Sequence, residues 1–170
     1  MDIVCLDFKK GFDEVPHRRL LAKVRACGVA GQVANWIANW LPIREQRVAV
    51  SVRMSCWEDV SSGVPQGLVF GPLLFIIHIN DFDNGVKSKL SKFTDDRKLG
   101  GDVEIRGDDD QIQESIDTCI DWAEDWQMEF NLSKCKLLGM GKNNENRDYR
   151  MQGVILERVT QEKDRHRYGR

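Results

Sequence analysis

The sequence predicts an α/β fold in which strands and helices form two layers. Two observations lead to this prediction. Strand-like and helix-like stretches alternate along the 170 residues, which is typical of a two-layer domain. Apolar residues make up 41% of the chain, enough to bury one core and to form one domain with at most a small appendage.

The first element is expected at residues 3–8, an almost unbroken apolar run that ends in charge. Such a run predicts a central strand covered on both faces, and it places Asp7 near the end of that strand. A helix should follow between Pro16, which suits a first helical turn, and Gly28, which suits a helix end.

A second helix is predicted from Gly31 to Leu41, just before Pro42. Its apolar residues recur at the spacing of one helix face, which we expect to be buried. They are Val33, Trp36, Ile37, Trp40 and Leu41. Valines then alternate with polar or small residues over 48–52, as in an exposed strand, and residues 57–60 are expected to form its hairpin partner.

A loop rich in glycine and proline, residues 61–72, leads into residues 73–79, which are apolar nearly all round. This pattern predicts a rigid loop followed by a buried helix. Within the loop, the glycines of Gly63–Gly67 let backbone N–H groups approach a ligand, and Gln66 offers both a donor and an acceptor. A turn that merely introduces the helix explains the same residues equally well, so both interpretations stay open here.

Residues 89–99 are interpreted as a strand, a tight acidic turn at Asp95-Asp96 and a second strand. The remaining elements are predicted in order: a helix capped by Asp108 or Asp109, a strand at 134–140, a polar linker at 141–150, a short strand at 154–156 and a frayed tail at 161–170. The inner face of the helix should comprise Ile112, Ile116, Cys119, Ile120, Ala123 and Trp126.

The formal net charge of −2 and the pI near 5.9 argue against a strongly basic nucleic-acid-binding domain. A nucleic-acid role would therefore depend on local patches. Five cysteines without a C-x-x-C motif predict reduced intracellular thiols, in nucleus or cytoplasm, and the three histidines lack zinc-ligand spacing. The N-terminus does not read as a signal peptide, and the longest apolar run, 67–79, is shorter than the roughly 20 residues of a membrane span.

Three carboxylates are candidates for a metal site. Asp95 and Asp96 alone are most simply a solvated hairpin tip. A strand that ends at Asp7 beside this hairpin would bring the three carboxylates to one edge of a sheet. Such a cluster requires cations, and hard oxygen ligands favour Mg²⁺, or Mn²⁺ in its place. Two ions about 3.5–4 Å apart would hold the attacking and leaving oxygens of a phosphoryl displacement.

Four blocks of the sequence occur in the order and spacing of a known family. They are LDFKKGFDEVPH (6–17), SSGVPQGLVFGPLLFIIHINDF (61–82), KFTDDRKL (92–99) and WAEDWQMEFNLSKCK (122–136). With them the chain resembles the palm of reverse transcriptases from non-LTR, LINE-type retrotransposons, most closely those of the jockey-related branch. The resemblance extends from about Ile3 to Asp164.

This resemblance implies a palm, a small antiparallel sheet packed by helices, over residues 1–140. Residues 141–170 would form a linker, the start of a thumb-proximal strand and the tail, with the fingers absent and the thumb mostly absent. The implied activity is RNA-directed DNA polymerisation, a two-metal transfer of dNTPs onto the 3′-hydroxyl of a DNA primer along an RNA template.

The resemblance also implies roles for individual residues. Catalytic and metal-binding roles would belong to Asp7, Asp95 and Asp96, nucleotide and template contacts to Phe12, Gln66 and Gly67, and a place near the leaving pyrophosphate to Lys134. Phe12 would lie under the sugar and select deoxynucleotides. For Lys134, a solvated lysine at a strand edge is the simpler interpretation.

The chain departs from the family where Ala, Ser, Leu, Tyr and a small polar residue are usual. At those positions it has Thr94, Leu68, Phe70, His78 and Arg97. Leu68 and Phe70 alter the loop that would hold template and nucleotide, and Arg97 puts a permanent cation beside Asp96 that would compete with metal for it.

These departures support an alternative function, a catalytically inactive, truncated retrotransposon remnant with at most residual RNA or protein binding. A metal-dependent phosphohydrolase or nucleotide cyclase is a third hypothesis, less favoured because residues 63–67 have no role in it. No membrane partner is expected, and the sequence leaves the oligomeric state open.

Overall fold

The computed structural model describes residues 1–67, 69–93, 96–101, 108–141, 144 and 147–160. The chain divides into two compact units. The first, which we call the sheet unit, comprises Met1–Phe8, Asp83–Glu124 and the described residues from Glu129 on. The second, the helical unit, comprises Lys9–Phe82 and Asp125–Met128.

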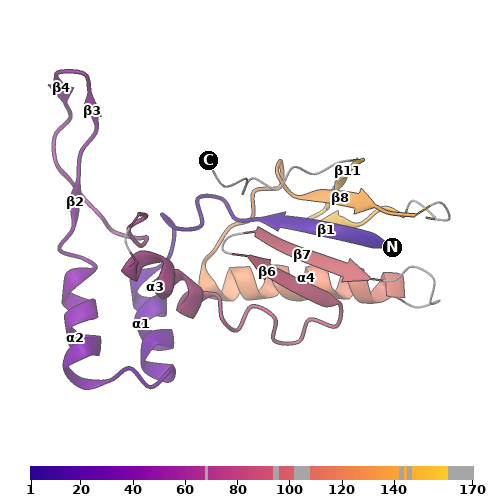
Figure 1. Cartoon of the computed structure of the whole chain (residues 1–170), viewed down its shortest axis with the longest axis horizontal. Coiled ribbons are helices and arrows are strands. Elements are labelled where there is room, and N and C mark those ends of the chain that lie inside the picture. Colours follow the sequence, from indigo (N-terminus) through magenta and orange to yellow (C-terminus); the bar gives the residue numbers. More distant parts are fainter. Residues whose placement is uncertain (68, 94–95, 102–107, 142–143, 145–146, 161–170) are drawn as a thin grey trace. The chain divides into compact units, whose positions relative to one another are not determined.

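The sheet unit is built on a five-stranded sheet with the strand order β11-β8-β1-β7-β6 (Figure 1). Its strands are β1 (Asp2–Asp7), β6 (Lys89–Phe93), β7 (Asp96–Gly101), β8 (Lys136–Gly139) and β11 (Glu157–Val159). Only the β8–β11 pair is parallel among these described strands; the other pairs are antiparallel. The first predicted strand, the two paired strands of the acidic hairpin and the strand within 134–140 are thus confirmed, and β1 is central. Of the predicted turn at Asp95-Asp96, Asp96 belongs to β7 and Asp95 lies outside the described residues.

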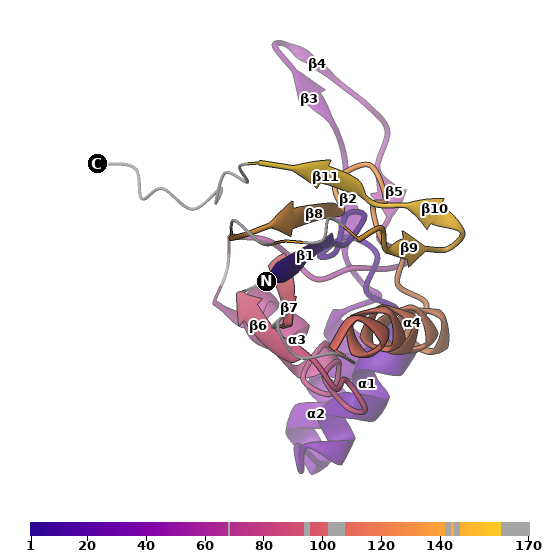
Figure 2. The same ribbon diagram turned by 90° about the vertical axis from the view of Figure 1, so that its right-hand side faces the viewer.

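Helix α4 (Asp108–Trp126) lies along one face of this sheet, as both views show (Figures 1 and 2). Its buried residues include Ile112, Ile116 and Cys119, as predicted, whereas Ile120 and Trp126 are half-buried. Side chains of β1 alternate between buried and half-buried, so one face of this strand is fully covered, as predicted, and the other only partly. Because α4 covers only one face, residues on the other face, Asp7 among them, keep some exposure.

A small hairpin follows β8. It pairs β9 (Arg150–Met151) with β10 (Val154–Ile155) and leads into β11 (Figure 2). The short strand predicted at 154–156 is therefore present in β10. Strand β11 continues the same sheet as β1, although the sequence analysis assigns residues after 140 to a linker and a separate strand. The predicted domain boundary at residue 140 stays a prediction.

The helical unit contains α1 (His17–Ala26), α2 (Gly31–Trp40) and α3 (Phe70–His78). Pro16 directly precedes α1, and Gly28 follows its end with a positive φ of 88°, so both predicted boundaries are confirmed. The predicted burial is only partly right. Val33 and Trp36 of α2 are about half exposed, and so are Leu73 and Ile76 of α3. Helix α1 packs against both neighbours, and the Trp36 ring contacts the Phe70 ring of α3, with 5.4 Å between the ring centres.

A long hairpin joins α2 to the glycine-rich loop. Its base pairs β2 (Glu45–Gln46) with β5 (Glu58–Asp59), and its tip pairs β3 (Ala49–Val50) with β4 (Arg53–Met54). The valines at 48, 50 and 52 are all exposed, as predicted. Among the described residues, no helix has both the length and the apolar character needed to cross a membrane.

One charged group is buried among the helices. Lys23 of α1 is almost fully buried, forms an ion pair with Asp81 and donates to the carbonyl oxygen of His78. Its ammonium also lies 3.5 Å from the centre of the Trp126 ring. Burial lowers the pKa of Lys23, and the Asp81 carboxylate opposes this shift. The lysine therefore connects α1 to the residues that end α3.

Candidate active site

The sheet places two of the predicted acidic residues directly opposite each other. Asp7 is the last residue of β1 and faces Asp96 in the antiparallel β1–β7 register. Asp96 also faces Phe93 across the β6–β7 hairpin, so residues 94 and 95 are the two that connect these strands. Asp95 and the side chain of Asp96 lie outside the described part of the structure. The backbone register thus brings Asp7 to the acidic turn.

Asp7 is held through its backbone and has a lysine close to its side chain. Its amide donates to Cys135 Sγ at 3.5 Å, and its carbonyl oxygen accepts from the Asn131 amide at 2.8 Å. Burial raises the pKa of the Cys135 thiol to about 11, so this thiol is protonated at neutral pH. Lys134 Nζ lies 3.7 Å from Asp7 Oδ1. Asp7 therefore has a fixed backbone position and a nearby positive charge.

Lys134 combines features of both interpretations offered for it. Its side chain is 41% exposed, as expected of a solvated lysine, and it also forms the ion pair with Asp7. At this exposure the pair contributes little to stability, about 0–1 kcal/mol. Its position beside the predicted metal ligand is compatible with a role near phosphate, which stays a prediction.

Arg97 faces away from Asp7. It lies opposite Leu6 in the β1–β7 register and is only 1% exposed, on the same buried face as Leu99. Neighbouring residues of a strand point to opposite faces, so Leu6 and Arg97 share the face that Asp7 does not. Burial raises the pKa of the Cys119 thiol on α4 to about 12, and the nearby positive charge of Arg97 opposes this shift. The expected competition by Arg97 at the metal site therefore has no support here.

In the helical unit, the glycine loop is fastened to the chain segment that follows β1. The amide of Gly63 donates to Val15 O at 2.8 Å, and the amide of Val64 donates to Phe12 O at 2.7 Å. The Ser62 hydroxyl donates to Asp13 O at 2.8 Å. Two sequence blocks that are far apart in the chain, 6–17 and 61–82, therefore meet through backbone hydrogen bonds.

At two glycines, another part of the backbone lies too close to leave room for a Cβ atom. A Cβ atom at Gly63, which has a φ of 83°, would lie 2.5 Å from Asp13 O. A Cβ atom at Gly71 would lie 1.7 Å from Pro65 O. Gly67 also has a positive φ, 81°, but a Cβ atom there would meet nothing within 4 Å. Lack of space thus explains Gly63 and Gly71, whereas Gly67 is explained by backbone conformation alone.

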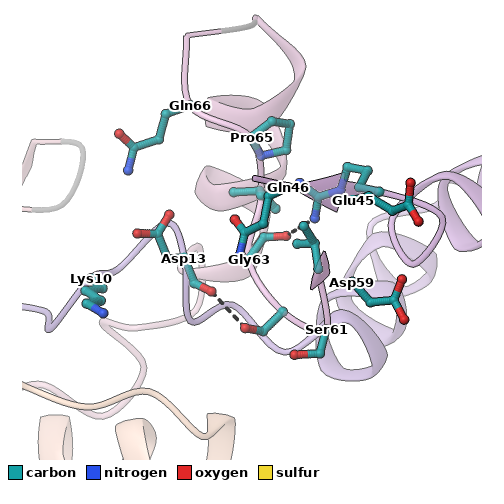
Figure 3. Close-up of a pocket in the computed structure, with 13 residues that line it drawn as sticks. Lys10, Asp13, Glu45, Gln46, Asp59, Ser61, Gly63, Pro65 and Gln66 are labelled. Carbon is teal, nitrogen blue, oxygen red and sulfur yellow. Dashed lines mark hydrogen bonds between the residues drawn. The ribbon is translucent and has the colours of Figure 1, made fainter. Parts of the chain in front are cut away.

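The loop borders a cleft of about 750 Å³ (Figure 3). Gln66 lies at one side of this cleft with Lys10 and Asp13, and Glu45 and Asp59 lie at the other. Gln66 is exposed, so its amide is available to a ligand. The cleft therefore offers hydrogen-bonding groups and charges of both signs.

Phe12 and Gly67, the other predicted nucleotide contacts, do not line the cleft. The Phe12 ring stacks on the Phe75 ring of α3, with 4.3 Å between the ring centres. The carbonyl oxygen of Phe12 thus binds the glycine loop, while the Phe12 ring packs on α3, the helix that follows this loop.

Sequence reasoning did not assign functional roles to Lys10, Asp13 or Arg44, which also line the cleft. Lys10 and Asp13 lie inside the first family block, so their positions gave a signal. Arg44 stands in the connection after α2 without any pattern around it. No group of three or more metal-ligating side chains occurs among the residues whose side chains are described.

The comparisons with known proteins agree with this arrangement of blocks. Residues 2–158 match the family described as reverse transcriptase (RNA-dependent DNA polymerase). The chain belongs to the reverse transcriptase family. The match covers both the sheet that carries Asp7 and the glycine loop, which confirms the resemblance inferred from the four sequence blocks.

Several curated relatives come from mobile elements of Drosophila. The chain is 28% identical over 139 residues to the RNA-directed DNA polymerase from mobile element jockey of Drosophila melanogaster, covering 76% of this chain and 15% of that protein. It is 28% identical over 176 residues to the jockey polymerase of Drosophila funebris (90% and 19%). It is 30% identical over 135 residues to the probable RNA-directed DNA polymerase from transposon X-element of Drosophila melanogaster (76% and 15%). The chain thus spans less than a fifth of the length of these reverse transcriptases.

Proposed function

We propose that the chain carries the catalytic carboxylates of an RNA-directed DNA polymerase. In this reaction the 3′-hydroxyl of a DNA primer attacks the α-phosphate of a dNTP, and pyrophosphate leaves. The observation that carries the proposal is the pairing of Asp7 with Asp96 in the β1–β7 register. Membership of the reverse transcriptase family supports it.

The residues at this sheet edge suit a magnesium ion. Asp7, Asp95 and Asp96 offer hard carboxylate oxygens, and β1 and β7 bring the first and third of them into register. These three residues would hold Mg²⁺ or Mn²⁺. When bound, a pair of such ions stabilises the negative charge on the attacking and leaving oxygens.

Each unit would contribute groups of its own to the reaction. Lys134 would balance part of the negative charge at Asp7, from which its ammonium is 3.7 Å away. Phe12, held by stacking on Phe75, would lie under the sugar and favour deoxynucleotides. Gln66 would donate to and accept from a nucleotide or template at the cleft. Gly67, next to it in the chain, would let the backbone come close to that ligand.

The substrates of the proposed reaction are an RNA template, a DNA primer and dNTPs. The net charge of −2 gives no general attraction for nucleic acid, so binding would depend on local positive charge. Lys10 at the cleft is such a group. This predicts a shallow dependence of RNA affinity on salt, since few phosphates would be neutralised.

The test is primer extension by the purified chain with an RNA template, a DNA primer, dNTPs and Mg²⁺. The Asp7→Asn variant should abolish extension, because it removes the negative charge that binds the cation. The matched control is Asp121→Asn, an exposed aspartate of α4, which should extend like the parent.

Two results would contradict the proposal. Extension by Asp7→Asn at the parental rate would remove Asp7 from the site. No extension by the parent, together with no Mn²⁺ binding that depends on Asp7 when measured by electron paramagnetic resonance, would favour the alternative of an inactive retrotransposon remnant. An RNA-binding assay would then decide whether residual binding is left.

A further inference from the structure

One peptide group of the glycine loop is held from both sides. The Val64 amide donates to Phe12 O at 2.7 Å, and the Gly63 carbonyl oxygen of the same peptide group faces two side chains. Arg44 Nη2 donates to this oxygen at 2.5 Å, and His17 Nε2 lies 2.9 Å from it. Gly63 is buried, so loss of these partners would leave a polar atom unsatisfied at a substantial cost.

Arg44 is itself fixed in orientation. Its Nε donates to Leu41 O at 3.0 Å, just beyond the end of α2, and its guanidinium lies 5.4 Å from the centre of the Trp40 ring. A guanidinium is planar and rigid, so bonds through Nε and Nη2 together define its plane. Arg44 thus connects the end of α2 to the Gly63 peptide.

His17 reaches the same oxygen from the first residue of α1. Its Nε2 is 3.2 Å from Arg44 Nη2. Burial lowers the pKa of His17, and the positive charge of Arg44 lowers it further, while the contacts with the Gly63 and Ser62 backbone oppose this shift. The neutral ring, with its hydrogen on Nε2, can donate to Gly63 O without adding a second charge beside Arg44.

We propose that His17 and Arg44 are positioning residues that fix the Gly63–Val64 peptide group, and through it the placement of Gln66 at the cleft. The consequence of this positioning rests on the proposed function: a correctly placed Gln66 would help the incoming nucleotide to bind in the right position. Pro65 separates the fixed peptide from Gln66 and limits the rotation between them. Movement of the Gly63 carbonyl would therefore change where the Gln66 amide points.

The first experiment measures amide hydrogen exchange of Gly63 and Val64 in the folded chain and needs no activity. Arg44→Ala should speed exchange at both amides by about tenfold, the equivalent of one hydrogen bond of typical strength. Arg53→Ala, an exposed arginine of β4 in the same unit, is the matched control and should leave both rates unchanged. His17→Gln keeps a donor for Gly63 O and should exchange nearly as slowly as the parent, whereas His17→Leu should exchange faster.

The second experiment measures primer extension with dGTP on an RNA template. Arg44→Ala and His17→Leu should raise the KM for dGTP by about tenfold with a smaller change in kcat, and His17→Gln should restore it. A role confined to general stability would not produce this separation or this rescue. Thermal unfolding of each variant shows whether it is folded, and Arg44→Lys, which keeps the charge, replaces any variant that is not.

The two measurements separate the two ideas. Unchanged exchange at Gly63 and Val64 in Arg44→Ala would overturn the positioning role whether or not the chain polymerises. Faster exchange with an unaltered KM for dGTP would also overturn it. A parent chain that extends no primer would overturn the proposed function, and the exchange rates would then still decide whether His17 and Arg44 fix the loop.

Discussion

The acidic edge of the sheet unit and the glycine loop of the helical unit are held in place by different kinds of contact. The strand that ends at Asp7 is positioned by pairing, with β7 along its whole length and with β8 as far as Cys5. The loop is positioned by a few separate bonds around Gly63, some of them from side chains. The strand that ends at Asp7 is therefore held by a series of similar backbone bonds, whereas the glycine loop is held by a few separate bonds.

This difference determines how each region should respond to mutation. In a strand ladder, the loss of one side chain leaves the backbone bonds of its neighbours intact, and the register is kept because a slip would turn every side chain to the other face. In the loop, one substitution can remove a contact that nothing else replaces. The following predictions test this contrast, beginning with the largest expected effect.

Removal of core volume beneath the sheet should destabilise the sheet unit most. Leu99 is fully buried and faces Val4 in the β1–β7 register. Leu99→Ala should lower the free energy of unfolding by about 2–5 kcal/mol, through lost burial and the cavity left behind. Urea unfolding followed by circular dichroism measures this. Amide protection of β1 in the folded variant should keep its alternating pattern, and a changed pattern would show that packing, not the ladder, sets the register.

The glycines of the loop should differ from each other in a defined way. Alanine at Gly63 or Gly67 adopts an unfavourable positive φ, which costs about 1–2 kcal/mol. Gly63→Ala also forces Cβ against Asp13 O, 2.5 Å away, which should cost about 1–3 kcal/mol more. The free energy of unfolding in urea should therefore fall further for Gly63→Ala than for Gly67→Ala. Equal losses would mean that the contact between the loop and Asp13 is not tight in solution.

The helical unit should also be the more sensitive of the two to mild acid. Burial, followed by the nearby charge of Lys23, lowers the pKa of His78 from 6.5 to about 3. The unfolded state therefore binds a proton more readily than the folded state between these values. Stability contributed by neutral His78 is fully present above pH 6.5 and should fall by about 1.4 kcal/mol for each pH unit below it.

Amide exchange measured at about pH 6 and pH 5 tests this, with α1 and α3 expected to lose protection before β1. His78→Leu removes the titrating group and serves as the control, because carboxylates contribute equally in both proteins. Its stability should depend less steeply on pH than that of the parent. The same slope in both would show that His78 does not carry the acid sensitivity.

Much of the backbone could be predicted from local signals. Pro16 and Gly28 define the ends of α1, and the apolar run before Asp7 predicts β1, because proline, glycine and hydrophobic period act within a few residues. The acidic hairpin followed from the same reasoning. Its partner strand was only a hypothesis, since no local signal tells which strand pairs with which, and the Asp7–Asp96 register appeared only in the structure.

The remaining features depend on contacts between distant parts of the chain. Val33 and Trp36 have the spacing of a buried helix face, yet they are exposed, because spacing does not show which elements are available to cover that face. Arg44 had no sequence pattern around it, and its importance comes from a bond to a carbonyl oxygen 19 residues away. Arg97 looked like a charge beside the acids until strand alternation put it on the buried face.

The smallest effect is expected at the tip of the long hairpin. Val52 is 94% exposed, so Val52→Thr should change the free energy of unfolding by no more than about 0.5 kcal/mol. Val48, Val50 and Val52 alternate with small or polar residues, whereas β1 comes from an almost unbroken apolar run and alternates between buried and half-buried side chains. Urea unfolding at two protein concentrations tests this. A larger loss of unfolding free energy that grows with protein concentration would mean that another molecule covers the hairpin valines in solution. The hairpin and β1 would then differ in what covers them: another molecule for the hairpin, the chain's own core for β1.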